Sequence, residues 1–502
     1  MIFSNYNSLL CQFTTLLFLT ISGCTQNINP NNIHHNSQNS DLEQCRLMFS
    51  NIKKTITDNH TQDAQASTIK NFPYLRNNRF LASFRQQTLS DLAFKQWINQ
   101  MEAIALQSIQ IEIHNLPPTI KSSMPTKQQI KNCSQQLKKQ DFFQSKSRFS
   151  NISQLKTMTI DEEYQTWKRF FGAYWLTSWG MKLGIHQMHK TIKATYQVSL
   201  DKLTDNKRLI HYVPAEKIKK SSTTNIRKMI KNSYNNDLKI PQLSNSELSQ
   251  LFENFAPIWA IDVKTNQDKI GNPQWIQGMQ QAVIDIAHPN IFHYHSHTRF
   301  NHKNLLQLNY VIWFPSRPAE SFIDILSGHL DGLIWRVTLD EDGSVLVYDT
   351  IHNCGCYHQY YPAKNMCLKP ADGLLQEPPF APQIAPTLNT SERILLRIAH
   401  TSHFIDRVTT SKNLKGHQVA YQLSDYNDLR SIKIQGSTKY KSLFQENGII
   451  AGTQRGERWI LWPMGIPGPG EMRQRGHHAT AFLGKKHFDD IDLLERSFER
   501  CR

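Results

Sequence analysis

From Ile258 onward the sequence is a succession of short apolar segments separated by turn residues, and this pattern constrains the fold more than any other feature. The segments are rich in Val, Ile, Tyr and Trp, which are common in strands. Many short strands at such spacing are typical of a β-sandwich or a barrel. The predicted strands are Ile258–Val263, Ala282–Ile286, Ile291–Phe300, Leu305–Phe314, Leu333–Leu339, Val345–Ile351, Arg393–Ala399, Val419–Leu423, Leu429–Ile434 and Trp459–Leu461.

The strongest hairpin signal joins Leu333–Leu339 to the strand that starts at Val345. Asp342-Gly343 lies between them, and both residues tolerate the positive φ that a tight hairpin turn requires. Trp335 and Val337 alternate with polar residues, so one face of the first strand is expected to be dry and the other wet.

The first half of the chain has helical periodicity instead. Apolar residues recur at helical spacing in Asp41–His60 and Trp97–Ile113. Capping-box spacing predicts helix starts at Thr159 and at Ser244, the second helix ending before Pro257. The predicted fold class is therefore α+β, a helical N-terminal half followed by an antiparallel β-sandwich or barrel-like domain. The expected parts are residues 24–75 (tether and first helical segment), 76–243 (mainly helical) and 244–502 (mainly β).

An aromatic run, Phe170–Met181, lies within the predicted helical part. It is too short to cross a membrane, which takes about 20 apolar residues. Two interpretations remain, a helix that lies on a lipid surface and a helix with a buried aromatic face. The buried face is the more common case and is the expectation here.

Ile21-Ser22-Gly23-Cys24 ends an apolar run near the N-terminus and is followed by a polar, Asn-rich tract. This stretch resembles the lipobox of bacterial lipoproteins. The resemblance implies that residues 1–23 are a signal peptide, that Cys24 carries the lipid (palmitate among its acyl chains), and that the tract after it is a flexible tether. Thr25, rather than Asp, follows the cysteine, which by the same resemblance implies a periplasm-facing lipoprotein of the outer membrane.

The net charge of +16 favours anionic partners. The expected export argues against nucleic acid, so anionic lipid headgroups and lipopolysaccharide are the nearer polyanions. A basic surface that only keeps the protein soluble is the other interpretation and the more common case.

Six cysteines remain for disulfides once Cys11 leaves with the signal peptide and Cys24 takes the lipid. An even number suits an oxidising compartment, although the sequence leaves about 15 pairings open. A bond from Cys45 to Cys133 would staple the N-terminal part, and Cys501 could tie the C-terminus to the body. The candidates are Cys45, Cys133, Cys354, Cys356, Cys367 and Cys501.

Two clusters of histidine could carry chemistry. His293, His295 and His297 share one face of a predicted strand, about 6.5–7 Å apart from one to the next. In the second cluster, His352 and His358 flank Cys354-Gly355-Cys356. A Zn or Cu site from His293, His295 and His358 is one hypothesis. The alternative is that the histidines are structural and that Cys354 and Cys356 form disulfides with each other or with Cys367.

The sequence lacks the local signatures of serine hydrolases, zincins and nucleotide-binding folds, so the catalytic residues stay unknown. The Pro- and Gly-rich stretch Trp462–Gly470 predicts a shaped loop, and Arg473 and Arg475 follow it. Freed amides beside two arginines can hold an anion. Arg299, Arg336 and Arg473 are the candidate anion-binding residues.

The body from about Ser244 resembles a family of proteobacterial lipoproteins of unknown activity. The resemblance rests on Ser296–Phe300, Leu330–Val337 and His352–Cys356, and it transfers no mechanism. The first hypothesis is an outer-membrane-anchored envelope lipoprotein with a binding or structural role. The second is a metal-dependent envelope hydrolase in which a metal-bound water attacks and Arg299 or Arg336 stabilises the transition state. Neither hypothesis specifies an oligomeric state.

Overall fold

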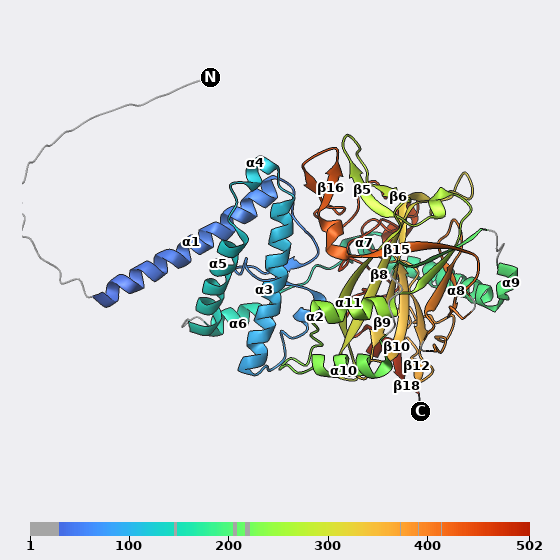
Figure 1. Ribbon diagram of the computed structural model, residues 1–502, viewed down its shortest axis with the longest axis horizontal. Helices are drawn as coiled ribbons and strands as arrows, with labels where there is room; N and C mark the ends of the chain where they lie inside the picture. The colour runs from blue at the N-terminus through green and yellow to red at the C-terminus, as the bar shows by residue number, and fades with distance from the viewer. Residues whose placement is uncertain are drawn as a thin grey trace, which may run out of the picture.

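The computed structural model describes residues 30–144, 148–203, 208–215, 221–371, 373–389, 391–412 and 414–501. The predicted signal peptide and Cys24 lie outside these residues. Figure 1 shows a helical part built from the first described residues beside a larger part built around a sheet. This α+β arrangement agrees with the predicted fold class.

The helical part packs around one apolar core, to which the aromatic residues Phe49, Tyr74, Phe94 and Trp97 contribute. The Ser90 side chain caps α3 by accepting a hydrogen bond from the Ala93 amide. A disulfide between Cys45 and Cys133 joins α1 to α5. The helices are α1 (Pro30–Asp58), α2 (Arg79–Ala82), α3 (Asp91–His114), α4 (Pro118–Lys121), α5 (Lys127–Lys139), the π-helical turn Gln140–Gln144 and α6 (Arg148–Lys156), with the short strands β1 (Ser67–Thr68) and β2 (Arg76–Asn77).

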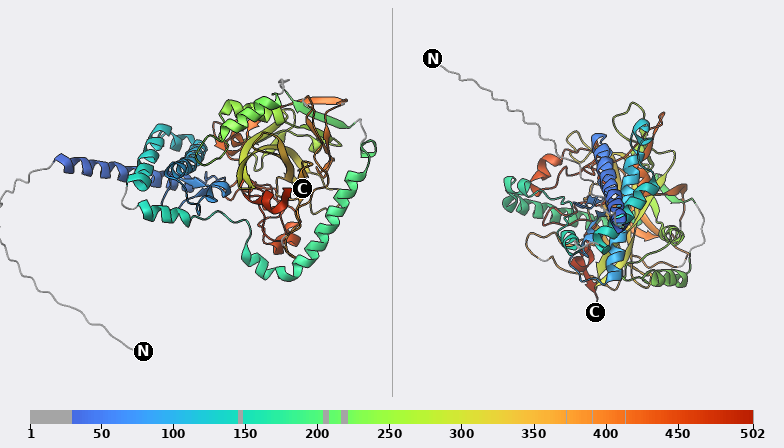
Figure 2. Two further views of the ribbon diagram at one scale, coloured as in Figure 1. Left: turned by 90° about the horizontal axis from the view of Figure 1, so that it is seen from below. Right: turned by 90° about the vertical axis from the view of Figure 1, so that its left-hand side faces the viewer.

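The larger part is built on a sheet of ten strands in the order β11-β10-β9-β8-β7-β15-β3-β4-β13-β14. Figure 2 shows this sheet curling into a half-barrel. Its strands are β3 (Leu209–Pro214), β4 (Ile258–Asp262), β7 (Asn290–Phe300), β8 (Lys303–Arg317), β9 (Gly328–Leu339), β10 (Val345–His352), β11 (Gln359–Pro362), β13 (Ile394–Ile398), β14 (Ile405–Thr410) and β15 (His417–Asp425).

Smaller elements surround this sheet. A disulfide between Cys367 and Cys501 ties the C-terminal strand β18 to β12. The remaining strands are β5 (Asn272–Ile276), β6 (Val283–Asp285), β12 (Met366–Leu368), β16 (Ile432–Gln435), β17 (Tyr440–Lys441) and β18 (Phe498–Arg500). The helices are α7 (Thr166–Phe171), α8 (Tyr174–Gln197), α9 (Leu200–Leu203), α10 (Thr223–Ser233), α11 (Asn245–Phe255), α12 (Arg458–Leu461) and α13 (Leu493–Ser497), with the 3-10 turns η2 (Asn266–Asp268), η3 (Tyr426–Arg430) and η4 (Trp462–Met464).

The sheet is mixed, which corrects the expectation of an antiparallel one. β15 is parallel to both β3 and β7, and β13 is parallel to β4. β3 comes from the segment expected to be helical, so residues 76–243 do not form one helical domain. Parallel pairing needs long connections, and the chain between β3 and β15 supplies one.

Local signals gave several correct elements. β9 and β10 form the predicted hairpin, with Val337 opposite Tyr348. The predicted wet face of the first strand is wrong, because Arg336 and Thr338 are buried as well. Ser244 and Glu247 form the predicted capping box of α11. The predicted helix start at Thr159 is wrong, because Glu162 instead pairs with His487, 3.1 Å away. The predicted strand Trp459–Leu461 is the helix α12, in which the Leu461 amide bonds to the Glu457 carbonyl.

The two faces of the sheet pack against different parts of the chain. On one face, Tyr310 and Trp335 share a core with α10 and α11, and the Tyr310 hydroxyl donates to the Phe252 carbonyl over 2.7 Å. On the other face, Val311 and Ile334 pack with the C-terminal segment. Within the described ranges, no helix combines the length and the apolar content that a membrane crossing requires.

Candidate functional site: a cavity at the open edge of β7

A cavity of about 850 Å³ lies where the helical part, strand β7 and the C-terminal segment meet. β15 pairs with β7 over Asn290–His293 only; no described strand pairs with this edge from Tyr294 onward, and the Arg299 amide bonds to the Ile491 carbonyl instead. Consecutive residues from both faces of β7 therefore line the same cavity. The cavity wall includes His293, Tyr294, His295 and His297 of β7, Arg79 and Phe80 of α2, Phe252 of α11, and Arg336, Asp425, Arg475, His478, Phe488 and Asp489.

The three predicted histidines of β7 do share one face of the strand, and each has a different environment. The His293 ring packs on Phe252, with ring centroids 4.2 Å apart. The Nε2 proton of His297 is donated to the Pro241 carbonyl over 3.1 Å, and burial lowers the pKa of His297 to about 3. His295 is exposed to the cavity, and burial followed by the charge of Arg475 lowers its pKa to about 4. Burial also lowers the pKa of His293, so all three rings favour the neutral form.

Arg475 presents a cation to the cavity. Its guanidinium carbon lies 4.8 Å from the Tyr294 ring centroid and 5.3 Å from that of Tyr426, which is typical of a cation–π arrangement. Within the described ranges, the side chain of Arg475 makes one hydrogen bond, in which Nη2 donates to the Asn427 Oδ1 over 3.3 Å. No carboxylate in these ranges lies within ion-pairing distance of the guanidinium. A guanidinium has five N–H donors. Most of the donors of Arg475 are thus available to a ligand.

The two carboxylates of the cavity wall already have partners. Asp489 lies 3.3 Å from the Nε of Arg79. Asp425 caps η3 by accepting the Asn427 amide over 2.8 Å. Beside them, the buried His478 has an Nε2 atom without a hydrogen-bond partner among the described residues. Burial, and then Arg473, lowers the pKa of His478 to about 3. A cation without an ion-pair partner in the described ranges and a histidine with an unsatisfied ring nitrogen thus belong to the wall of one cavity.

The predicted metal site is not brought together. His358 donates from Nε2 to Asp349, 2.8 Å away. Asp349 lies in a row across the sheet with Arg336 and Tyr294, which is the face opposite to that of His293 and His295. In the part of the chain that the structure describes, no group of three or more His, Cys, Asp or Glu side chains is arranged to hold a metal ion.

The three predicted anion-binding arginines are engaged elsewhere. Arg336 reaches the cavity wall but is held by Asp349, with 2.9 Å between Nε and Oδ1, and by the Phe488 carbonyl. Arg299 bonds to Asn304 and to Ser83 of the helical part, each over 3.0 Å. Arg473 is buried and donates to the carbonyls of Pro467 and Gly468. None of them offers a free guanidinium to the cavity.

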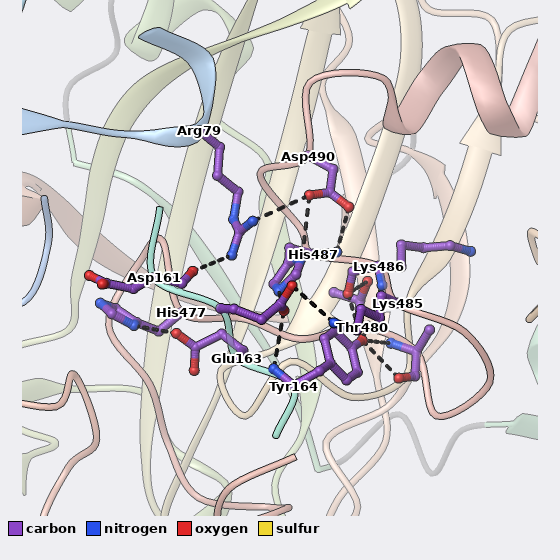
Figure 3. A network of polar contacts seen from close by, with 12 residues as sticks. Arg79, Asp161, Glu163, Tyr164, His477, Thr480, Lys485, Lys486, His487 and Asp490 are labelled. Atoms are coloured by element: carbon purple, nitrogen blue, oxygen red, sulfur yellow. Dashed lines mark hydrogen bonds and ion pairs between the residues drawn. The ribbon is translucent and has the colours of Figure 1, made fainter. Parts of the chain in front are cut away.

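A polar network fixes the C-terminal segment that forms one wall of the cavity (Figure 3). Tyr164 inserts its hydroxyl between the Ala481 and Lys486 carbonyls, 2.8 Å from each. His477 lies 2.6 Å from Glu163 and 2.7 Å from the Ala64 carbonyl. His487 lies between Glu162 and Asp490. Burial alone would lower the pKa of His477, but Glu163 raises it above its ordinary value.

We expect the pair of His477 and Glu163 to make stability depend on pH. Because the pKa of His477 is raised, the pair contributes fully to the free energy of unfolding below the pKa that His477 has in the unfolded chain. The contribution is lost as the pH rises through the pKa of His477 in the folded protein. Glu163→Gln should therefore reduce the free energy of unfolding by about 2 kcal/mol near pH 5 and by less near about pH 8. Urea unfolding at several pH values measures this difference. Lys485→Gln, which removes an exposed partner of Glu162, should leave the pH dependence unchanged; an identical deficit of Glu163→Gln at every pH would contradict the assignment.

Cys354 and Cys356 are free thiols in the structure, so the predicted disulfides involving them are not formed. Both line a small cavity of about 140 Å³ beneath α8. The Cys356 amide lies 3.4 Å from the Cys354 sulfur. Cys354 also packs in the apolar core of the sheet, which gives it a structural role.

Comparisons of the chain with models of protein families, with curated proteins and with solved structures found no match. The site therefore rests on its own geometry. The sequence predicts the shared face of the three histidines, but of the two arginines after the loop only Arg473, and not Arg475, is among the predicted anion-binding residues. Both arginines follow the predicted loop, and only their packing distinguishes the one that faces the cavity. No local signal marked Arg79 or Asp489 as wall residues.

Proposed function

We propose that the protein is an outer-membrane-anchored envelope lipoprotein that binds a small anionic ligand in the cavity at the edge of β7. The observation that carries the proposal is Arg475, whose guanidinium lies against the rings of both Tyr294 and Tyr426 and lines the cavity without an ion-pair partner among the described residues. Guanidinium groups suit carboxylate and phosphate groups, with which they form paired hydrogen bonds.

The cavity also sets the kind of ligand. Its volume lies within the range of about 300–1,000 Å³ that is typical of small-molecule sites. Phe80, Phe252 and Phe488 give it apolar walls beside the cation. A molecule with one anionic group and an apolar portion fits this combination.

Two disulfides support the envelope location. Such bonds persist in oxidising compartments such as the periplasm and are rare in the cytosol. They agree with the lipobox, which provides the proposed attachment through acylated Cys24. No observation in the site favours the metal-dependent hydrolase, since its three ligands lie on opposite faces of the sheet.

Titration calorimetry with inorganic phosphate, sulfate and a medium-chain fatty acid tests the binding proposal. We expect the fatty acid to bind more tightly than either inorganic ion, because it also buries apolar surface. Arg475→Gln should weaken its binding by at least about tenfold, the loss of a charge-assisted hydrogen bond.

Arg299→Gln is the matched control, because Arg299 is an arginine of β7, the strand that lines the cavity, but is itself outside the cavity wall. The affinity of the Arg299→Gln protein for the fatty acid should equal that of the parent protein. Thermal melting should show that both variants are folded. If the folded Arg475→Gln protein then binds the fatty acid as tightly as the parent protein does, Arg475 is ruled out as the anion-binding residue.

A further inference from the structure

The aromatic run that was expected to be buried is exposed. Trp167, Phe170 and Phe171 project from α7, Trp175 and Trp179 from the first half of α8, and Trp459 from α12; these six residues are called the aromatic face. Each is more than half exposed, and Trp175 is 72% exposed. Leu176, Leu183 and Ile460 lie exposed among them. Exposed apolar patches of this size on soluble proteins mark interaction sites.

Packing brings these elements together on one side of the molecule. The Gln165 amide bonds to the Gly465 carbonyl over 2.7 Å, and the Arg169 Nε bonds to the Met464 carbonyl over 2.9 Å. A side chain at Gly172 would lie 2.6 Å from Pro463, so the corner between α7 and α8 sits directly on η4, the turn that follows α12. Figure 2 shows α8 running along the outside of the curled sheet, with no other element beyond it.

Helix α8 has one buried side and one exposed side. Ser178 and Ile185 are buried toward the body of the protein. Trp175, Trp179 and Leu183 follow the helical spacing of three to four residues and point outward. The aromatic side chains are therefore presented away from the protein by a helix whose opposite side is already packed.

Charge distinguishes among partners for this face. Residues 166–199 contain Lys168, Arg169, Lys182, Lys190 and Lys193 but neither Asp nor Glu. The Lys168 and Lys182 ammonium groups lie 5.6 and 5.7 Å from the ring centroids of Trp167 and Trp179, and the Arg458 guanidinium carbon lies 4.8 Å from that of Trp459. Trp and Phe interleaved with Lys and Arg are typical of protein surfaces at the headgroup level of a bilayer.

We propose that the aromatic face is a docking surface for an anionic lipid bilayer. It inserts its aromatic rings among the headgroups while the neighbouring lysines contact lipid phosphates. This inference goes beyond ligand binding in the cavity and rests on the proposed envelope location. The docking surface would add a second membrane contact to the proposed acyl anchor at Cys24 and hold the sheet domain against the membrane surface.

The test uses the full chain with Cys24→Ser, which removes the proposed acylation site, and vesicle flotation. We expect the protein to float with vesicles of phosphatidylcholine and phosphatidylglycerol in equal parts, and much less with phosphatidylcholine alone. Its tryptophan emission should shift to shorter wavelength on binding. Raising the salt concentration should weaken the binding, because exposed charges are screened.

Trp175→Glu combined with Trp179→Glu should weaken this binding by at least about tenfold, because two rings no longer insert and two like charges meet the lipid. Both side chains are exposed, so the fold should persist. Phe149→Glu is the matched control, since Phe149 is 84% exposed but lies on α6 of the helical part; its binding should equal that of the Cys24→Ser parent. Calorimetry with the medium-chain fatty acid in the double variant separates this proposal from the proposed function, because binding in the cavity should be unchanged.

Equal flotation of the double variant and the parent would overturn the proposal. A parent that is dimeric without lipid and becomes monomeric in the double variant would also overturn it, because the aromatic face would then cover a second copy of the chain.

Discussion

Replacing Asp63 by asparagine should lower the free energy of unfolding by about 3–5 kcal/mol, the cost of leaving one member of a buried ion pair without its partner. Asp63 follows α1 and accepts from Arg430 of η3, with 3.1 Å between its Oδ1 and the Arg430 Nε. Gln474 donates to the same Asp63 oxygen over 2.9 Å, and Ser108 of α3 accepts from Arg430. The pair thus joins the helical part to the C-terminal segment of the sheet domain.

The pH dependence of this pair has the opposite sign to that of His477. Burial alone would raise the pKa of Asp63, but Arg430 lowers it below its ordinary value. The pair therefore contributes fully to the free energy of unfolding above the pKa that Asp63 has in the unfolded chain. This contribution is lost as the pH falls through the pKa of Asp63 in the folded protein. Urea unfolding of Asp63→Asn near neutral pH measures the full effect.

Asp91→Asn is the control for Asp63→Asn. Asp91 pairs with Arg148 over 2.9 Å, but 90% of its side chain is exposed. Surface pairs contribute about 0–1 kcal/mol, so this variant should unfold almost as the parent protein does. A loss below about 1 kcal/mol for Asp63→Asn would show that the buried pair does not hold the two parts together.

Removing the disulfide between Cys45 and Cys133 should have an effect of similar size. The bond closes a loop across a sequence separation of 88 residues and joins α1 to α5. A cross-link over a loop of this length stabilises a protein mainly by restricting the unfolded chain, by about 2–5 kcal/mol. The double variant Cys45→Ala with Cys133→Ala should therefore unfold at a clearly lower urea concentration.

Reduction with dithiothreitol provides the complementary measurement. The parent protein should lose the contributions of both disulfides, whereas the Cys45→Ala, Cys133→Ala variant should lose only that of Cys367 and Cys501. Cys354→Ala should lose as much on reduction as the parent does, because Cys354 is a free thiol. A parent protein whose stability is unaffected by reduction would contradict both disulfide contributions.

Features that depend on neighbouring residues were predictable from the sequence. The hairpin of β9 and β10 depends on alternation and a turn that tolerates positive φ, and α11 depends on a capping box within one turn. Both signals act within a few residues and need no distant partner. The α+β class follows from the same patterns, summed along the chain.

Features that depend on distant partners could not be predicted from the sequence. The insertion of β3 between β15 and β4 requires segments about 50 and 200 residues apart to pair. Glu162 has the spacing of a capping residue, yet the imidazole of His487, more than 300 residues away, holds it instead. A local preference worth about 1 kcal/mol gives way when a tertiary contact satisfies the same group.

By itself the sequence determined the class of fold, the hairpin, the capped helix and the face that His293, His295 and His297 share, because strand and helix periodicity set these positions. Only the tertiary structure decided that His358 lies on the opposite face, that Arg475 rather than Arg473 meets the cavity, and that the aromatic run of α7 and α8 points outward. Each of these depends on which surface a distant segment covers. Periodicity specifies that a side chain has a face, whereas packing specifies what that face meets.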